Sequence, residues 1–444
     1  MKVGGEMCVY ARRAAGYAVL SAMTLFAPRD ARAQDSAPQH DMQDSTMQHD
    51  MQMNMDMASP GGWQFMQDGI VFALFNHQGG PRGTDEVKAP NWWMGMASRK
   101  VGSSQLTLNA MFSLDPLTAG KDGYADIFQV GEALNGRPLI DRQHPHDLFM
   151  QLAAVWRIPL TSATGFTVAG GPAGEPALGP VAFMHRASAA EYPFAPLSHH
   201  TFDSTHISYG VVTVAVDHGP MVIEGSLFNG REPDENRWDF DFGRLDSVSG
   251  RFWYKPTDRW EFQVSTGHLV HPEQLEPGNV QRTTTSASWF AKSGGDFTAI
   301  TVGYGLNVTD DATRHAVFGE ATRRVGANTL FGRIEALQVE TNLLLTDSIP
   351  LTHDEAARKD IVGAFTLGGV RDVAKVHGFE GGIGGAVTFY AVPDPLKATH
   401  GEHPVSFQVY FRVRPPASHM GRMWNMRMSQ PPMAGHADHG MSTP

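Results

Sequence analysis

Segments of about ten residues with alternating apolar and polar side chains recur along most of this 444-residue chain. In the segment 405–413, for example, Val405 and Phe407 alternate with Ser406 and Gln408, and strands are likewise expected over 204–216, 313–325 and 328–340. A two-residue period places the apolar side chains on one face of a β-strand and the polar side chains on the other. The connections between segments fall into a short class and a long class, as the turns and outer loops of membrane β-barrels do.

We therefore predict an all-β fold, an antiparallel transmembrane β-barrel of about sixteen strands within a range of about 12–18, spanning residues 63–414. No apolar run in the mature chain approaches the roughly 20 residues that a membrane helix needs. In lipid every backbone amide must be paired internally, so the sheet has to close. A soluble β-sandwich would also give alternating strands, but it offers no reason for two loop-length classes.

Residues 1–33 are predicted to be a secretory signal peptide. An arginine pair at 12–13 precedes the apolar run 14–27, and a small-residue cleavage site follows at 31–33. The only cysteine of the chain, Cys8, lies in this segment, so the mature protein has neither disulfides nor thiolate ligands. We expect a location in the bacterial outer membrane, with both termini in the periplasm because the strand number is even.

Two segments outside the predicted barrel, 34–62 and 415–444, are rich in methionine and histidine and are expected to be disordered. Thioether sulfur binds Cu(I) and Ag(I) well and hard cations poorly, while imidazole accepts several transition metals. These tails therefore predict copper binding, with Cu(I) favoured and silver as a second candidate. The candidate ligands are His40, Met42, Met47, His49, Met51, Met53, Met55, Met57, His419, Met420, Met423, Met426, Met428, Met433, His436, His439 and Met441.

A second group of histidines lies inside the predicted barrel region, at His144, His146, His199, His200 and His206. One interpretation is a lumenal site for Cu(II) or Zn(II), since these ligands are harder than thioethers. The other is a polar network that holds loops in place, because barrel interiors are polar.

The mixed-charge segment 229–237 is expected to be a salt-bridged loop, in which Arg231 and Arg237 neutralise the neighbouring carboxylates Glu232, Asp234 and Glu235. The alternative is a divalent-cation site formed by the same three carboxylates.

The Met/His-rich region 40–57 ahead of a barrel resembles the outer-membrane copper-resistance barrels of the CopB type. The blocks 142–147 and 198–207 look more like an uncharacterised family of bacterial outer-membrane proteins. The first resemblance implies copper handling at the outer membrane. The chain departs from the usual outer-membrane pattern at its C-terminus, because about thirty residues follow the last predicted strand instead of a terminal aromatic residue.

The functional prediction is a non-enzymatic barrel that binds periplasmic copper and contributes to its sequestration or efflux. Its expected partners are outer-membrane lipid, copper ions and periplasmic copper-handling proteins. The chain has a formal net charge of −11 and shows no basic face, which argues against a nucleic-acid partner. The alternatives are a general or solute-specific porin, and an outer-membrane hydrolase with a Ser–His pair oriented by an acidic group, drawn from His199, His200, Asp203, Ser204 and His206.

Overall fold

The computed structural model describes residues 62–274, 278–346, 357–417, 422 and 424–429. Residues from Phe65 onward form one compact unit. Sixteen strands build its wall. They are β1 (Gln64–His77), β3 (Asn91–Val101), β4 (Ser104–Phe112), β7 (Phe149–Pro159), β8 (Thr164–Gly174), β9 (Ser208–His218), β10 (Met221–Phe228), β11 (Ser247–Thr257), β12 (Trp260–Leu269), β13 (Val280–Ser293), β14 (Asp296–Val308), β15 (Thr313–Val325), β16 (Asn328–Glu340), β17 (Lys359–Val376), β18 (Phe379–Ala391) and β19 (Val405–Arg414).

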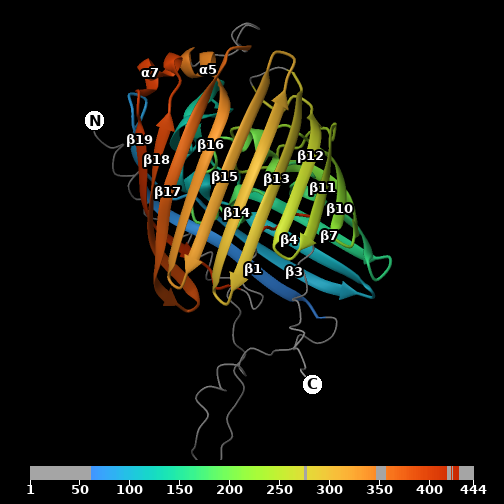
Figure 1. Cartoon of the computed structure of the whole chain (residues 1–444). Helices are drawn as coiled ribbons and strands as arrows, with labels where there is room; N and C mark the ends of the chain where they lie inside the picture. Colours follow the sequence, from blue (N-terminus) through green and yellow to red (C-terminus); the bar gives the residue numbers. More distant parts are fainter. Residues whose placement is uncertain (1–61, 275–277, 347–356, 418–421, 423, 430–444) are drawn as a thin grey trace, which may run out of the picture. The chain divides into compact units, whose positions relative to one another are not determined.

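The wall closes on itself. Neighbouring strands pair in antiparallel register, and β1 joins the two ends by pairing with β19, where Val71 lies opposite Val413, and with β3. Figure 1 shows the strands as tilted arrows around the lumen, with the short helices α5 (Thr341–Thr346) and α7 (Asp394–His400) at one end. The predicted closed antiparallel barrel of about sixteen strands is confirmed.

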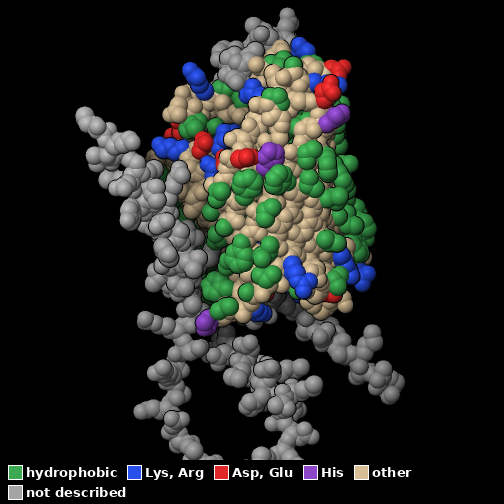
Figure 2. Space-filling view, turned by 90° about the vertical axis from the view of Figure 1, so that its left-hand side faces the viewer, with side chains coloured by type: hydrophobic (Ala, Val, Ile, Leu, Met, Phe, Trp, Pro, Cys, Tyr) green, Lys and Arg blue, Asp and Glu red, His purple; other side chains and the backbone are tan. Residues whose placement is uncertain are grey.

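The apolar face of each strand points outward. On β19, Val409 is 53% exposed, whereas the neighbouring Gln408 is 1% exposed and Arg412 is fully buried. Figure 2 shows apolar side chains spread over the outer wall, with charged side chains mainly towards its two ends. A soluble β-sandwich buries its apolar side chains and exposes its polar ones. Here the arrangement is reversed, so the outer surface suits lipid and the interior suits polar groups.

No helix among the described residues is long and apolar enough to cross a membrane.

Two inserted segments fill the lumen. The first connects β4 to β7 and contains the helix α3 (Asp115–Thr118) and the hairpin β5 (Tyr124–Leu134) and β6 (Arg137–Gln143). The second, Glu175–Ile207, connects β8 to β9 and is called the plug segment below. Every residue from Glu175 to His199 is buried except His185, which is half-buried. The short strand β2 (Asp85–Lys88) lines one rim against β1.

The plug segment ends four residues later than the sequence pattern indicated. The alternation predicted a strand over 204–216, but β9 begins at Ser208. Residues before it form α4 (His199–Phe202) and the 3₁₀ turn η2 (Ser204–His206), while η1 (Phe183–His185) lies further upstream. The local alternation was misleading here because none of residues 202–207 is exposed, so apolar and polar side chains do not meet different environments.

Buried ion pairs fasten the plug segment to the wall. Arg186, which is 1% exposed, donates to both carboxylate oxygens of Glu320 on β15 at 2.9 and 3.1 Å. Its remaining Nη1 donates to Asp203 at 2.7 Å and to the carbonyl oxygen of Val181 at 2.8 Å. Removing a buried guanidinium with these four hydrogen bonds is costly, because its carboxylate partners would remain buried without this cationic partner.

The C-terminal residues 424–429 also dock in the lumen, which corrects the expectation of a disordered tail from 415 onward. The backbone amide of Asn425 donates to the carbonyl oxygen of His185, and Asn425 Oδ1 accepts from Ala187. Arg427 pairs with the buried Glu224 of β10 at 3.3 Å. The composition alone suggested a solvated tail, but these contacts depend on a wall and a plug that lie far away in sequence.

Candidate lumenal histidine site

The five histidines predicted inside the barrel gather in one cluster. His144 and His146 follow β6, whereas His199, His200 and His206 belong to the plug segment. The ring centroids of His199 and His206 lie 5.3 Å apart, and those of His199 and His200 lie 5.5 Å apart. His146 lies 5.7 Å from His206, and His144 lies 5.7 Å from His200. Two segments separated by more than fifty residues therefore supply one site.

Four of these rings are oriented through Nδ1 by an acceptor. The pairs are His146 with Asp115 at 2.8 Å, His199 with the Asp203 carboxylate at 2.8 Å, His206 with the Asp203 carbonyl at 2.8 Å, and His200 with Glu232 at 3.1 Å. An Nδ1–H that donates to an oxygen fixes the ring and leaves the Nε2 lone pair for a ligand, as in many metal centres. In the described part of the chain, the buried Nε2 of His206 has no hydrogen-bond partner.

His144 differs from the other four. Its Nδ1 lies 3.2 Å from the carbonyl oxygen of Pro145, and its Nε2 lies 3.3 Å from Glu132. Both nitrogens are therefore occupied, and His144 contributes to the walls of the site more than to its ligand set.

Burial disfavours the protonated form of three of these imidazoles. Loss of solvent lowers the pKa of His144, His199 and His206, and repulsion from neighbouring imidazoles lowers it further. Burial alone would raise the pKa of Asp203, but Arg186 and His199 outweigh it and hold that pKa well below its usual range. Neutral imidazoles beside an ionised carboxylate are ready to accept a cation without first losing protons.

The tightest set of ligand atoms lies at the edge of this cluster. His200, Glu232 and Glu273 place one ligand atom each within 4.8 Å of one another. The acidic loop residues Asp234, Asp239 and Asp241 form the only other such set in the described ranges. Among the remaining imidazoles, His146 meets His206 edge to face, whereas His199 is tilted against His206.

The charged loop at 229–237 is not neutralised internally, contrary to the expectation. Arg231 pairs with Asp246 at 2.8 Å, and Arg237 reaches across to Glu132 and to Asp147. Glu232 instead faces His200. The loop folds against other segments, so its charges find partners outside the local sequence.

The candidate triad of a hydrolase is not assembled. Ser204 Oγ accepts a hydrogen bond from Arg282 at 3.0 Å. None of the hydrogen bonds found in the described residues joins Ser204 to His199 or His206, so the hydroxyl has no imidazole base next to it.

Most predicted tail ligands lie outside the described residues, and their role stays a prediction. They are His40, Met42, Met47, His49, Met51, Met53, Met55, Met57, His419, Met420, Met423, Met433, His436, His439 and Met441. Met426 and Met428 are described, and both line a cavity in the lumen.

Sequence reasoning did not single out the wall methionines of that cavity. Met94, Met111 and Met150 come from β3, β4 and β7, and His185 comes from the plug segment. On β3 the residues on both faces are apolar, as in Trp92–Trp93–Met94, so alternation gave no signal for which side chains point inward.

The fold defines the class of protein: a closed antiparallel barrel with an apolar outer wall and a polar, filled lumen, of the bacterial outer-membrane type. No protein-family model matches the chain, and no curated protein matches it either.

Solved outer-membrane barrels are similar in fold. An anion-selective porin from Comamonas acidovorans has 12% identity and a TM-score of 0.49, covering 79% of this chain and 99% of the porin. OprB of Pseudomonas putida has 9% identity and a TM-score of 0.48, over 80% and 94% of the two chains. A loop L8 deletion mutant of OmpT from Vibrio cholerae has 9% identity and a TM-score of 0.46, over 80% and 100%. The barrel that the resemblance implies is present in the structure, and the copper-resistance part of the resemblance stays a prediction.

Proposed function

We propose that this protein is a non-enzymatic outer-membrane barrel that binds copper and contributes to the sequestration or efflux of periplasmic copper. The observation that carries the proposal is the lumenal cluster of His146, His199, His200 and His206, in which acceptors hold every Nδ1. The buried Nε2 of His206 has no hydrogen-bond partner among the described residues, so its lone pair is open to a ligand.

The ligand types favour a divalent ion at this cluster. Imidazole and carboxylate suit both Cu(II) and Zn(II). Of the two, Cu(II) binds more tightly to a given set of nitrogen and oxygen ligands. The methionines of the two tails would serve Cu(I), with Ag(I) as a substitute. On this proposal the tails capture periplasmic copper and the lumenal cluster retains it.

The test is Cu(II) binding by the full-length protein and by the variant His199→Asn/His206→Asn. Asparagine is polar and smaller, so the variant removes two imidazoles without placing a charge in the lumen. The matched control is His218→Asn/His315→Asn, whose histidines are exposed on the barrel wall. We expect the lumenal variant to lose one bound Cu(II) relative to the control. Equal Cu(II) stoichiometry in both variants would contradict the lumenal site.

A second candidate is a solute channel. The observation that favours it is the polar inner wall, on which Gln263, Thr284 and Ser286 form a buried hydrogen-bonded group. Barrels of this size leave a lumen wide enough for solute when no segment fills it. Metal-free protein in planar lipid bilayers separates the two candidates: steady ion conductance would favour the channel, and a silent membrane would favour the copper-binding barrel.

A further inference from the structure

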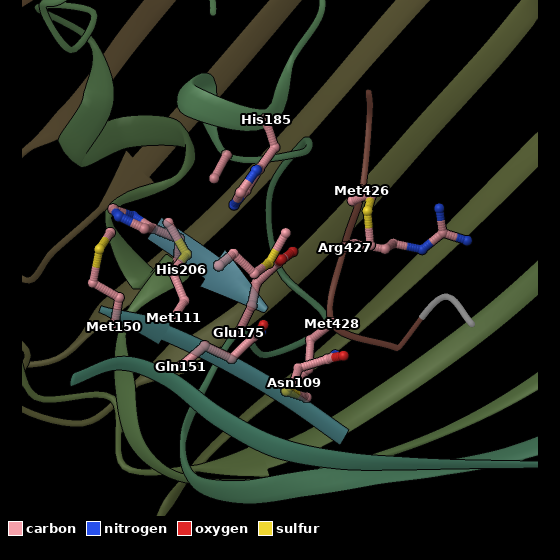
Figure 3. A pocket seen from close by; sticks show the side chains of 12 residues that line it. Asn109, Met111, Met150, Gln151, Glu175, His185, His206, Met426, Arg427 and Met428 are labelled. Carbon is pink, nitrogen blue, oxygen red and sulfur yellow. The ribbon is translucent and has the colours of Figure 1, made fainter. Parts of the chain in front are cut away.

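A cavity of about 20 Å³ lies between the plug segment, the wall and the docked C-terminal residues. Its lining is rich in thioether and imidazole groups, as Figure 3 shows. In that view Met111 and Met150 lie beside His206, and His185 points into the same space. The lining residues with soft or borderline donors are Met94, Met111, Met150, Met426, Met428, His185 and His206.

The wall methionines form a row across three neighbouring strands. Met94 of β3 and Met111 of β4 are directly opposite each other in the register. Met150 lies on β7 at the point where the pairing with β4 shifts, beside Gln151, which is opposite Met111. All three are nearly fully buried inside the barrel. These three methionines, which come from three different strands, thus line one cavity.

The docked C-terminal residues complete the lining. Met426 and Met428 line the same cavity, and in Figure 3 they lie on the other side of the view from Met111 and Met150. Met428 is 2% exposed, and its sulfur lies so close to Gly174 that a side chain there would collide with it. The position of Met428 is therefore set by close packing.

The charged groups around the cavity are already paired. Glu175 accepts from Arg251 at 2.9 Å, and Arg427 pairs with Glu224 at 3.3 Å. The donors left for a ligand are neutral thioethers and imidazoles, among them His206 Nε2, and no described hydrogen bond uses the His185 ring. Neutral sulfur ligands bind soft monovalent ions and give a hard divalent ion no anionic partner.

We infer that this cavity is a binding site for a soft monovalent metal ion, Cu(I) or Ag(I), held by the sulfur atoms of Met94, Met111, Met150 and Met428 together with His206. The site goes beyond the proposed histidine cluster, since it shares only His206 with it. A cavity of this volume has room for one water molecule or one ion.

The alternative explanation is that methionine fills irregular space in the core. A filler role would not require two imidazoles at the same cavity with no hydrogen-bond partner for His206 Nε2. It would also apply equally to Met66, Met96 and Met184, which are buried in the same interior but do not line this cavity. Those three residues therefore provide a matched control.

The test compares Ag(I) binding by full-length Met94→Leu/Met111→Leu/Met150→Leu and full-length Met66→Leu/Met96→Leu/Met184→Leu. Leucine has a similar volume and no sulfur donor, so both variants are expected to fold. Both variants keep the tail ligands, so at one fixed free Ag(I) concentration the tails should bind the same amount of Ag(I) in each. We expect the first variant to bind one Ag(I) fewer than the second, which should equal the wild type.

Equal Ag(I) stoichiometry in the two variants would overturn the inference. Should the first variant fail to fold, silver-soaked crystals of the wild-type protein decide: an anomalous silver peak in the cavity supports the site, and its absence refutes it. His206 belongs to both proposed sites, so the Cu(II) assay is repeated on His199→Asn alone, which changes neither His206 nor a methionine. Loss of Cu(II) binding with intact Ag(I) binding would separate the two proposals, and so would the reverse.

Discussion

Replacing Arg186 by methionine should loosen the plug segment. Arg186 makes four hydrogen bonds from a site that is 1% exposed, and two of them go to Glu320 on the wall. Methionine keeps most of the aliphatic bulk, so the change removes charge and hydrogen bonds more than volume. Asp203 and Glu320 would each lose a cationic partner inside the lumen.

The size of the effect follows from the partners left behind. Breaking a buried ion pair by removing one member costs about 3–5 kcal/mol, which multiplies the fraction of molecules with a released plug by roughly 10²–10⁴. The lower end is the better expectation here, because Glu320 retains Arg333 at 3.0 Å and Asp203 retains His199 at 2.8 Å.

The assay is limited proteolysis of the plug segment together with ion conductance in planar bilayers. We expect cleavage within 175–207 and conductance bursts that the wild type lacks. The control is Arg323→Met, an exposed residue of the same strand, β15. If Arg186→Met stays as protease-resistant and as silent as the control, then the buried ion pairs do not hold the plug, and the reasoning fails.

Three further changes test the packing, the lipid-facing wall and the titration of the lumen. Gly179 has φ +82°, and a Cβ added there would lie 2.2 Å from the Phe202 carbonyl oxygen. Gly179→Ala should therefore cost more than about 1 kcal/mol of stability and speed proteolysis of the plug segment. Unchanged cleavage would contradict the conformation at Gly179. Val302→Arg, at the centre of β14 and 49% exposed, should cost about 2–4 kcal/mol in denaturant unfolding, with Val302→Leu as the neutral control. Burial lowers the pKa of His199 and His206 below 6.5, so their contribution to plug stability is present above that pH and declines as the pH falls through it. Proteolysis of the plug segment should therefore quicken between about pH 7.5 and about pH 5, and a flat profile would refute the assignment.

Local alternation was enough to predict the wall where one strand face meets lipid. The expected strands 313–325 and 328–340 coincide with β15 and β16. It missed β8, whose residues Val168–Gly174 are mostly small, so apolar and polar faces differ little there. A two-residue period is informative only where the two faces meet different environments.

The candidate histidines were predictable as residue types, but their arrangement was not. His199 and His200 stand in a dense run, which drew attention to them in the sequence. Their orientation depends on Glu232 and on Asp203, and nothing in the spacing predicted that Glu232 would face His200. Hydrogen bonds between loops are decided by how the whole chain packs.

The sequence by itself determined that the chain forms a closed barrel with an apolar outer face, because strand periodicity and the need to pair every backbone amide in lipid are local or universal requirements. Only the tertiary structure decided what fills the lumen. Arg186 and Glu320 are 134 residues apart, and Asn425 meets Ala187 across 238 residues. Such contacts arise only once the wall has closed, since each inserted segment finds its partners on strands that no local pattern connects to it.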